Sequence, residues 1–114
     1  MNTLEKYVAG LLACAAVPAA VAQQERWPAK PVRVIVTYPA GGVVDVLTRA
    51  VTTEIAREFG QPVVVEARPG AGANIGAELA SKAAPDGYTL MVSAPFLLNN
   101  HLIEKNLRWQ VKDI

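Results

Sequence analysis

The chain has 114 residues, of which 52% are hydrophobic and 18% are charged, and its formal net charge is +1. This length fits one small domain, and the balance of apolar and charged residues is typical of a globular protein, not of a disordered chain. The nearly even charge excludes the strongly basic surface that nucleic-acid binding requires, so no nucleic-acid partner is expected.

Residues 1–22 are predicted to be a signal peptide. Lys6 lies in a short polar start, residues 8–20 are apolar and rich in alanine, and Ala20-Val21-Ala22 has the small-x-small pattern of a cleavage site. Cleavage between Ala22 and Gln23 would yield an exported, periplasmic product. The alternative interpretation of this segment is a buried first helix.

Cys14 is the only cysteine. The stretch Leu11-Leu12-Ala13-Cys14 loosely matches a lipoprotein processing box, which would tether the protein to a membrane by a lipid. The apolar stretch before Cys14 is short and continues after it, so we favour a soluble product over a lipoprotein. Loss of the peptide would also remove the only thiol, and the mature chain could then form no disulfide.

After a linker at residues 23–30, residues 31–114 are expected to form a partial α/β lobe. Val32 to Thr37 is a β-branched run, which predicts a strand buried on both faces, as in parallel sheets. Residues 45–59 are predicted to form an amphipathic helix that closes at Gly60 in a left-handed conformation. Its apolar residues recur every four positions, at Leu47, Val51, Ile55 and Phe59.

A second strand at Val63–Val65 and a third at Tyr88–Ser93 are predicted, with a second helix between them. Asn74 is the expected N-cap of this helix, which would run to Ala84. Its inner stripe would be Ile75, Leu79 and Ala83, and a turn at Pro85-Asp86-Gly87 would follow. A further helix at Asn99–Leu107 is expected, and Arg108-Trp109 would lead into a strand that the chain does not contain. The βαβαβ order predicts a parallel sheet whose strand-to-helix loops gather at one edge.

Four stretches, in this order, carry a resemblance to a known family. They are Tyr38-Pro-Ala-Gly-Gly-x-x-Asp45, Val65-Glu-x-Arg-Pro-Gly-Ala-Gly-x-Asn-Ile-Gly-Ala77, Ala83-Ala-Pro-Asp-Gly-Tyr-Thr-Leu90 and Val111-Lys-Asp113. The chain resembles the periplasmic solute-binding receptors of tripartite tricarboxylate transporters, the Bug family. The resemblance implies the first lobe of a periplasmic binding protein type II fold, a small carboxylate ligand and membrane transporter subunits as partners. Such receptors are much longer than this chain.

The first candidate site is the corner between the first strand and the first helix, comprising Tyr38, Pro39, Ala40, Gly41, Gly42 and Asp45. Two adjacent glycines let a ligand approach the main chain, and a helix start offers unpaired N–H groups. We expect the N–H groups of Gly41 and Gly42 to receive a ligand carboxylate, with Tyr38 as a wall of the pocket. The alternatives are a plain tight turn and, for Asp45, a helix-capping role. The resemblance implies that Asp45 faces the ligand, and the apolar Val43 and Val44 depart from the family's pattern.

The loops after the other two strands should reach the same cleft. They supply the candidate ligand-binding residues Ala73, Asn74, Ser93 and Ala94. Gly70, Gly72 and Gly76 also invite a dinucleotide interpretation, but their spacing is G-x-G-x-x-x-G and the loop follows the second strand, so no cofactor is expected. Close packing on the sheet is the simpler role for Gly76.

The sequence contains no catalytic motif. His101 is the only histidine and no nucleophile elbow or metal-binding cluster accompanies it, so the chain is predicted not to be an enzyme. The prediction is therefore a fragment of a carboxylate-binding receptor. Two alternatives stay open: a small Rossmann-like nucleotide-binding enzyme and a non-functional truncated receptor.

Overall fold

The computed structural model describes residues 26–114. The signal peptide, its cleavage site at Ala22 and Gln23, and Cys14 lie outside the described residues. The elements, in order, are β1 (Val32–Val36), α2 (Val43–Phe59), β2 (Val63–Ala67), the 3-10 turn η2 (Ala71–Ala73), α3 (Asn74–Ser81), β3 (Thr89–Val92), α4 (Phe96–Ile103) and the 3-10 turn η3 (Val111–Asp113). The predicted βαβαβ order is confirmed.

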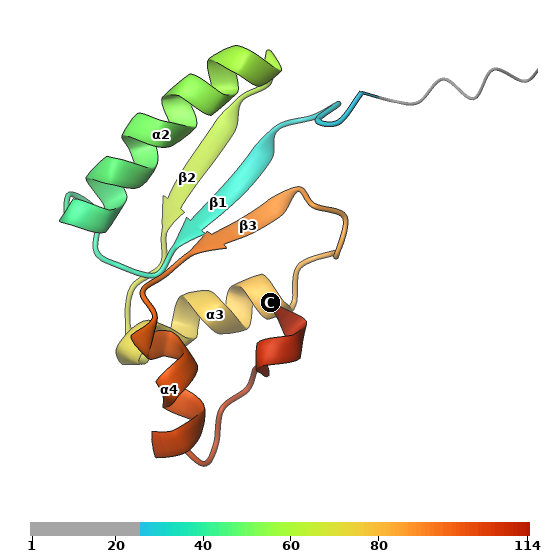
Figure 1. Ribbon diagram of the computed structural model, residues 1–114. Coiled ribbons are helices and arrows are strands. Elements are labelled where there is room, and N and C mark those ends of the chain that lie inside the picture. Colours follow the sequence, from blue (N-terminus) through green and yellow to red (C-terminus); the bar gives the residue numbers. More distant parts are fainter. Residues whose placement is uncertain (1–25) are drawn as a thin grey trace, which may run out of the picture.

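The three strands form one parallel sheet in the order β2-β1-β3 (Figure 1). β1 is the central strand, and four of its five residues are buried, because both of its faces are covered by other elements. Its register pairs Val34 with Val65 on one side and with Leu90 on the other. The β-branched sequence of β1 is what such a central parallel strand requires.

Helices α2 and α3 lie on opposite faces of the sheet (Figure 1). α2 packs mainly on β2, whereas α3 packs on β3 and β1. Gly60 closes α2 with φ 65° and donates its N–H to the carbonyl of Ala56, which confirms the predicted left-handed cap. Helix α2 begins at Val43, two residues earlier than expected, because Gly42 serves as its N-cap.

The predicted inner stripe of α3 is wrong at Ile75. Ile75 is 51% exposed, and the residues that face the sheet are Gly76 and Ala77. A Cβ atom on Gly76 would lie 2.8 Å from the Cγ2 atom of Thr37 and 3.0 Å from the carbonyl oxygen of Arg68. The helix therefore lies so close to the sheet that no larger side chain fits at this position. The close approach selects small residues for the inner face of the helix and confirms the packing role of Gly76.

The C-terminal segment also differs from the prediction. The helix α4 covers Phe96–Ile103 instead of residues 99–107. Trp109 is buried in a core cluster with Ala73, Ala77 and Leu97, against which Met91 and Leu107 pack. This cluster fastens α4 and the last residues to α3. None of the helices in residues 26–114 is long and apolar enough to cross a bilayer.

Candidate ligand-binding site

The carboxyl ends of the three strands meet at one edge of the sheet, as predicted. Thr37, which follows β1, donates its hydroxyl to the Oγ atom of Ser93, which follows β3, at 2.9 Å. Arg68, which follows β2, donates its N–H to the carbonyl of Val36 at 2.7 Å. The predicted site residues Ser93 and Ala94 therefore lie at the same edge as the loop between β1 and α2.

In that first loop, the two glycine N–H groups are not free, contrary to the prediction. Gly41 donates its N–H to the Oδ2 atom of Asp45 at 2.9 Å, and Gly42 donates to the carbonyl of Pro39 at 3.2 Å. Gly41 has φ 80°, a left-handed conformation that a glycine adopts without strain and that turns its N–H toward Asp45. These two amides hold the turn together and cannot also receive a ligand carboxylate.

The backbone N–H groups without an acceptor are those of the next two residues after Gly42. The first hydrogen bond within α2 runs from the N–H of Val46 to the carbonyl of Gly42, at 2.9 Å. Among the described residues, the N–H groups of Val43 and Val44 have no hydrogen-bond acceptor. They belong to the first turn of a 17-residue helix, where the helix dipole favours an anion.

Asp45 stabilises the loop between β1 and α2. The residue is 3% exposed, and its carboxylate accepts hydrogen bonds from Gly41 and from Arg49 Nε at 3.0 and 3.1 Å. The hydrogen bond from Arg49 and, next, that from the Gly41 amide lower the pKa of Asp45 below its ordinary value of 3.8, while burial opposes this effect. With its carboxylate engaged by two donors of the protein, Asp45 shapes the loop that presents Val43 and Val44.

Asp45 should make the stability of the chain depend on acid. Because its folded-state pKa is lowered, its contribution is present above 3.8 and is lost as the pH falls through the folded-state pKa. Asp45→Asn should therefore lower the urea midpoint at pH 7 and leave it close to that of the parent at pH 2. Arg49→Leu, which removes the largest cause of the shift, should flatten the acid limb in the same way. An unchanged acid limb in both variants would contradict this role.

The second loop, after β2, is held in a left-handed conformation over three consecutive residues. Ala71 has φ 47°, Gly72 φ 61° and Ala73 φ 74°. A non-glycine residue in this region is strained by roughly 1–2 kcal/mol. The conformation turns the chain directly into α3, with Ala73 and not Asn74 as the N-cap residue, so the predicted capping role of Asn74 is wrong.

This strain gives a test by substitution. Ala71→Gly should stabilise the chain by up to about 1 kcal/mol, because Ala71 is exposed and glycine adopts positive φ freely. Ala80→Gly, in the regular part of α3, is the matched control and should destabilise it by about 1 kcal/mol. Urea denaturation of both variants measures the difference, and two changes of the same sign would argue against strain at Ala71.

Asn74 lies at the centre of a buried polar network. Its Oδ1 atom accepts hydrogen bonds from Trp109 Nε1 and Asn100 Nδ2, both at 3.0 Å, and its Nδ2 atom donates to Glu104 at 3.1 Å. Asn100 also donates to the carbonyl of Gly72 at 2.8 Å. The side chain of Asn74 thus fastens the second loop to α4 and Trp109.

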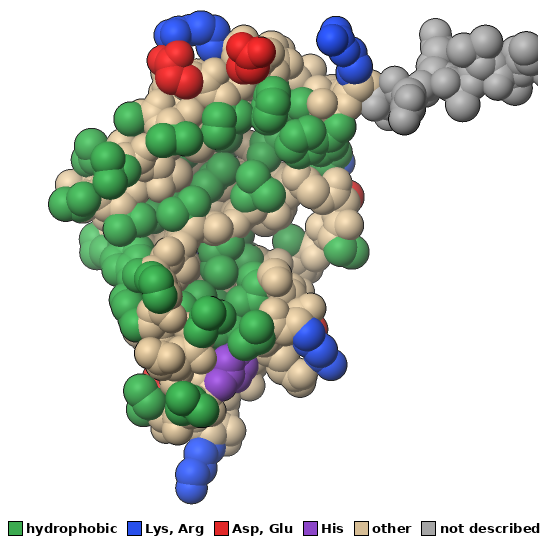
Figure 2. Space-filling model, in the orientation of Figure 1, with side chains coloured by type: hydrophobic (Ala, Val, Ile, Leu, Met, Phe, Trp, Pro, Cys, Tyr) green, Lys and Arg blue, Asp and Glu red, His purple; other side chains and the backbone are tan. Residues whose placement is uncertain are grey.

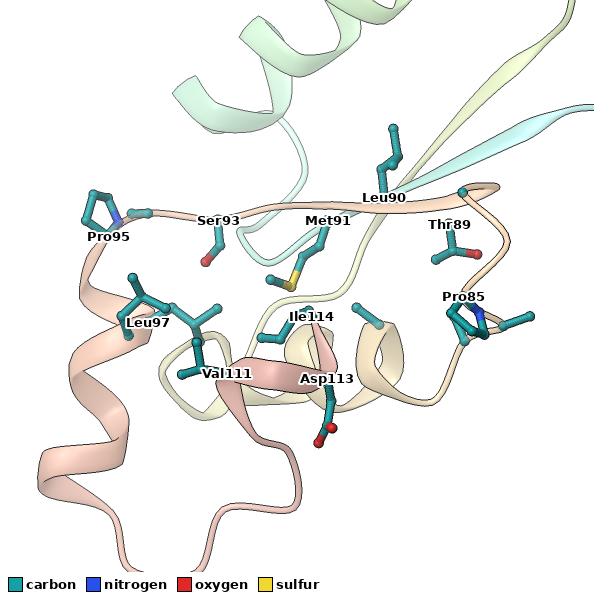
Figure 3. Close-up of a pocket in the computed structure, with 16 residues that line it drawn as sticks. Pro85, Thr89, Leu90, Met91, Ser93, Pro95, Leu97, Val111, Asp113 and Ile114 are labelled. Carbon is teal, nitrogen blue, oxygen red and sulfur yellow. The ribbon is translucent and has the colours of Figure 1, made fainter. Parts of the chain in front are cut away.

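Tyr38 lies beside the third loop. Its ring meets that of Phe96 edge to face, with centroids 6.0 Å apart, and its hydroxyl is buried with no hydrogen-bond partner among the described residues. Pro39 and Ala40 are exposed at the tip of the first loop. Ser93 and Ala94 line a cavity of about 690 Å³ that also includes Met91, Leu97 and Ile114 (Figure 3). That cavity is mainly apolar, so it does not resemble a carboxylate site.

Sequence reasoning missed three residues that organise this edge. Arg49 was detectable, because it stands four residues after Asp45 on the same helix face. Trp109 and Glu104 were not, because they come from 35 and 30 residues away along the chain from Asn74. Among the described residues, no group of three or more His, Cys, Asp or Glu side chains is placed to hold a metal ion.

A parallel α/β sheet whose loops and first helix start converge at the carboxyl edge is the architecture of a lobe of periplasmic binding proteins. Residues 47–114 match the tripartite tricarboxylate transporter family receptor. The chain belongs to this family.

Its relatives include a UPF0065 protein of Bordetella bronchiseptica, which is 44% identical over 74% of this chain and 24% of the relative. Protein BugT of Bordetella pertussis is 41% identical over 76% of this chain and 27% of its own length. The chain therefore spans about a quarter of the length of these relatives.

Solved structures give the same result. A periplasmic transporter is 42% identical, with a TM-score of 0.68 over 74% of this chain and 29% of that one. An R. palustris protein solved with adipate is 29% identical, with a TM-score of 0.67 over 74% and 28%. MatC of Rhodopseudomonas palustris with bound malate is 40% identical, with a TM-score of 0.54 over 57% and 22%. The predicted family and α/β fold are confirmed.

Proposed function

We propose that this chain is part of a periplasmic solute-binding receptor that captures a small carboxylate for a tripartite tricarboxylate transporter. The observation that carries the proposal is that two relatives of the same fold were solved with adipate and malate, both of which are dicarboxylates. The receptor is exported by the signal peptide at residues 1–22, delivers its solute to membrane transporter subunits and is not an enzyme.

The binding chemistry that we propose uses the first turn of α2. The free N–H groups of Val43 and Val44 receive one carboxylate of the solute, and the helix dipole stabilises its charge. Asp45, held by Arg49, keeps Gly41 and Gly42 in a turn that leaves the N–H groups of Val43 and Val44 accessible. Tyr38, Pro39 and Ala40 form the wall beside it, and the loops that carry Ala73, Asn74, Ser93 and Ala94 border it.

A receptor of this type encloses its solute between two lobes. This chain corresponds to about a quarter of the length of its relatives and contributes to one side of the cleft only. The 114-residue chain should therefore bind malate or adipate with millimolar or weaker affinity. Isothermal titration calorimetry measures this directly. Micromolar binding would contradict the prediction, because one helix start would then supply the affinity of a complete cleft.

The site itself is tested with two variants at one position. Val43→Pro removes an N–H group but suits the helix, because proline is favoured at the first helical position and the preceding Gly42 is extended, with φ −73° and ψ 167°. Val43→Ala is the matched control that keeps the N–H group. NMR titrations with malate follow the amide chemical shifts around Val44 and give the affinity. Val43→Ala should keep the affinity of the parent. Val43→Pro should bind malate about tenfold more weakly, as expected for the loss of a hydrogen bond to a charged group.

The nucleotide-binding alternative is separated from this proposal by a thermal-shift panel. Dicarboxylates at millimolar concentrations should raise the melting temperature slightly, and dinucleotides should not change it. A clear response to NAD without a response to dicarboxylates would favour the Rossmann-like enzyme. The absence of any malate-dependent shift at Val43 and Val44 would place the site elsewhere.

A further inference from the structure

The turn between α3 and β3 contains a motif to which the proposed binding function gives no role, Ala83-Ala-Pro-Asp-Gly-Tyr-Thr-Leu90. Within it lies Asp86-Gly87, and no other Asp or Asn in the chain is followed by glycine. The other two aspartates precede the bulky residues Val46 and Ile114. Asp86 and Gly87 are both exposed, and the segment between α3 and β3 lies at the rim of the molecule (Figure 2).

An aspartate that is followed by glycine can react with its own main chain. The backbone nitrogen of the glycine attacks the Cγ atom of the neutral carboxyl group, the amide proton and the carboxyl OH leave as water, and a cyclic succinimide forms. Water then opens the ring at either carbonyl, which returns aspartate or gives isoaspartate. Water is the only co-reactant, and nothing is oxidised or reduced. Glycine favours the attack because it has no Cβ atom to shield its nitrogen.

In the folded chain, both oxygens of the Asp86 carboxylate are engaged. Its Oδ1 atom accepts a hydrogen bond from the N–H of Tyr88 at 3.0 Å, and its Oδ2 atom lies 3.4 Å from the Nζ atom of Lys30. The hydrogen bond from Tyr88 lowers the pKa of Asp86 below its ordinary value of 3.8, and Lys30 adds to this effect, while burial opposes it. Both contacts favour the charged carboxylate, which is the unreactive form because it has no OH group to lose.

Tyr88 is itself fixed to the rest of the lobe. Its carbonyl accepts the N–H of Arg33 at 2.8 Å, and its hydroxyl accepts the N–H of Ala29 at 2.8 Å. The Nζ atom of Lys30 lies 4.4 Å from the centroid of its ring. Ring closure removes one of the two carboxyl oxygens of Asp86, so at least one of its contacts with Tyr88 and Lys30 must be lost before the reaction can proceed.

We propose that Asp86-Gly87 is a site of spontaneous backbone isomerisation, and that the contacts of Asp86 with Tyr88 and Lys30 slow this reaction in the folded protein. Isomerisation inserts one carbon atom into the main chain between Asp86 and Gly87 and relocates the carboxylate that holds the Tyr88 amide. Because the Tyr88 carbonyl pairs with Arg33 just before β3 begins, the product has an altered start of this strand. The modification is independent of solute binding.

The test follows the oxygen that enters when the ring opens. The 114-residue chain is kept folded, or unfolded in urea, in water enriched in heavy oxygen at mildly acidic pH. Either product gains one heavy oxygen at residue 86, which mass spectrometry locates in the tryptic peptide 83–105, and isoaspartate gives a second chromatographic peak. Label is expected at Asp86 and not at Asp45 or Asp113. It should appear on the order of tenfold more slowly in the folded chain, because the turn must open first.

Equal rates in the folded and unfolded chain would overturn the restraint by the fold. The absence of label at Asp86 in urea, or equally fast labelling of Asp45 or Asp113, would overturn the assignment of the site. Neither measurement involves a solute, so failure of this proposal is distinct from failure of the proposed binding function.

Three variants separate the parts played by Lys30 and Gly87. Lys30→Ala should speed labelling of the folded chain a few-fold and leave the rate in urea unchanged, as for loss of an exposed ion pair. Arg57→Ala, which removes an exposed cation paired with Glu54, is the matched control and should keep the parental rate. Gly87→Ala is measured in urea, where folding does not matter, and should slow labelling several-fold. An unchanged rate in Lys30→Ala would overturn the restraint, and one in Gly87→Ala would overturn the site.

Discussion

Asn74→Ala is expected to destabilise the described part of the chain by roughly 1–3 kcal/mol. The side chain of Asn74 is the acceptor for the Nε1 atom of Trp109, which is 3% exposed, and for the amide of Asn100. A buried donor left without an acceptor costs roughly 1–3 kcal/mol. Asn100 keeps the carbonyl of Gly72 as a second acceptor, so the loss falls mainly on the Trp109 indole and on the contact with Glu104.

The measurement is urea denaturation followed by tryptophan fluorescence in a Trp27→Phe background, so that Trp109 is the only reporter. The matched control is Asn99→Ala, in α4 but exposed, which should change stability by no more than about 0.5 kcal/mol. If Asn74→Ala were as mild as Asn99→Ala, the network would contribute nothing to stability and Asn74 would be free for a ligand.

Gly76→Ala should destabilise the chain although alanine is the better helix former. The substitution gains about 1 kcal/mol in helix propensity. Against this, the new methyl group would lie 2.8 Å from Thr37 and 3.0 Å from the backbone oxygen of Arg68, and overpacking of this kind costs about 1–3 kcal/mol. The carbonyl belongs to the loop after β2 and Thr37 is buried, so neither neighbour can move aside easily.

Ser81→Ala, at the end of the same helix, controls for propensity without steric conflict and should change stability little. Both variants are compared by thermal and urea unfolding. A Gly76→Ala variant more stable than the parent would show that α3 can move away from the sheet, and the close approach would then not explain the glycine.

These two positions have a bearing on the proposed site. Gly76 sets the distance of α3 from the end of β1, and Asn74 fixes the loop after β2 to α4. Together with Asp45, which holds the loop after β1, they keep the carboxyl edge in one conformation. In this lobe, therefore, several predicted ligand residues position the backbone, while the free donors are the amides of Val43 and Val44.

Local sequence determined the elements and their order. The β-branched run of β1, the left-handed Gly60 at the end of α2 and the alternation of strands with helices follow from properties of neighbouring residues, and so does the parallel sheet, since such crossovers favour it. Four motifs in a fixed order also identified the family. The sequence also predicted that the loops carrying the candidate residues gather at one edge of the sheet, because parallel strands end on the same side.

Tertiary structure decided what periodicity cannot encode. The apolar stripe of α2 is partly exposed, and Ile75 faces outward, because which helix face is buried depends on which elements are present to cover it. The amides of Gly41 and Gly42 are closed by Asp45 and Pro39, and Asn74 is held by residues 26 and 35 positions away. Such hydrogen bonds depend on where distant backbone comes to lie, and this is fixed only when the sheet and its helices pack together.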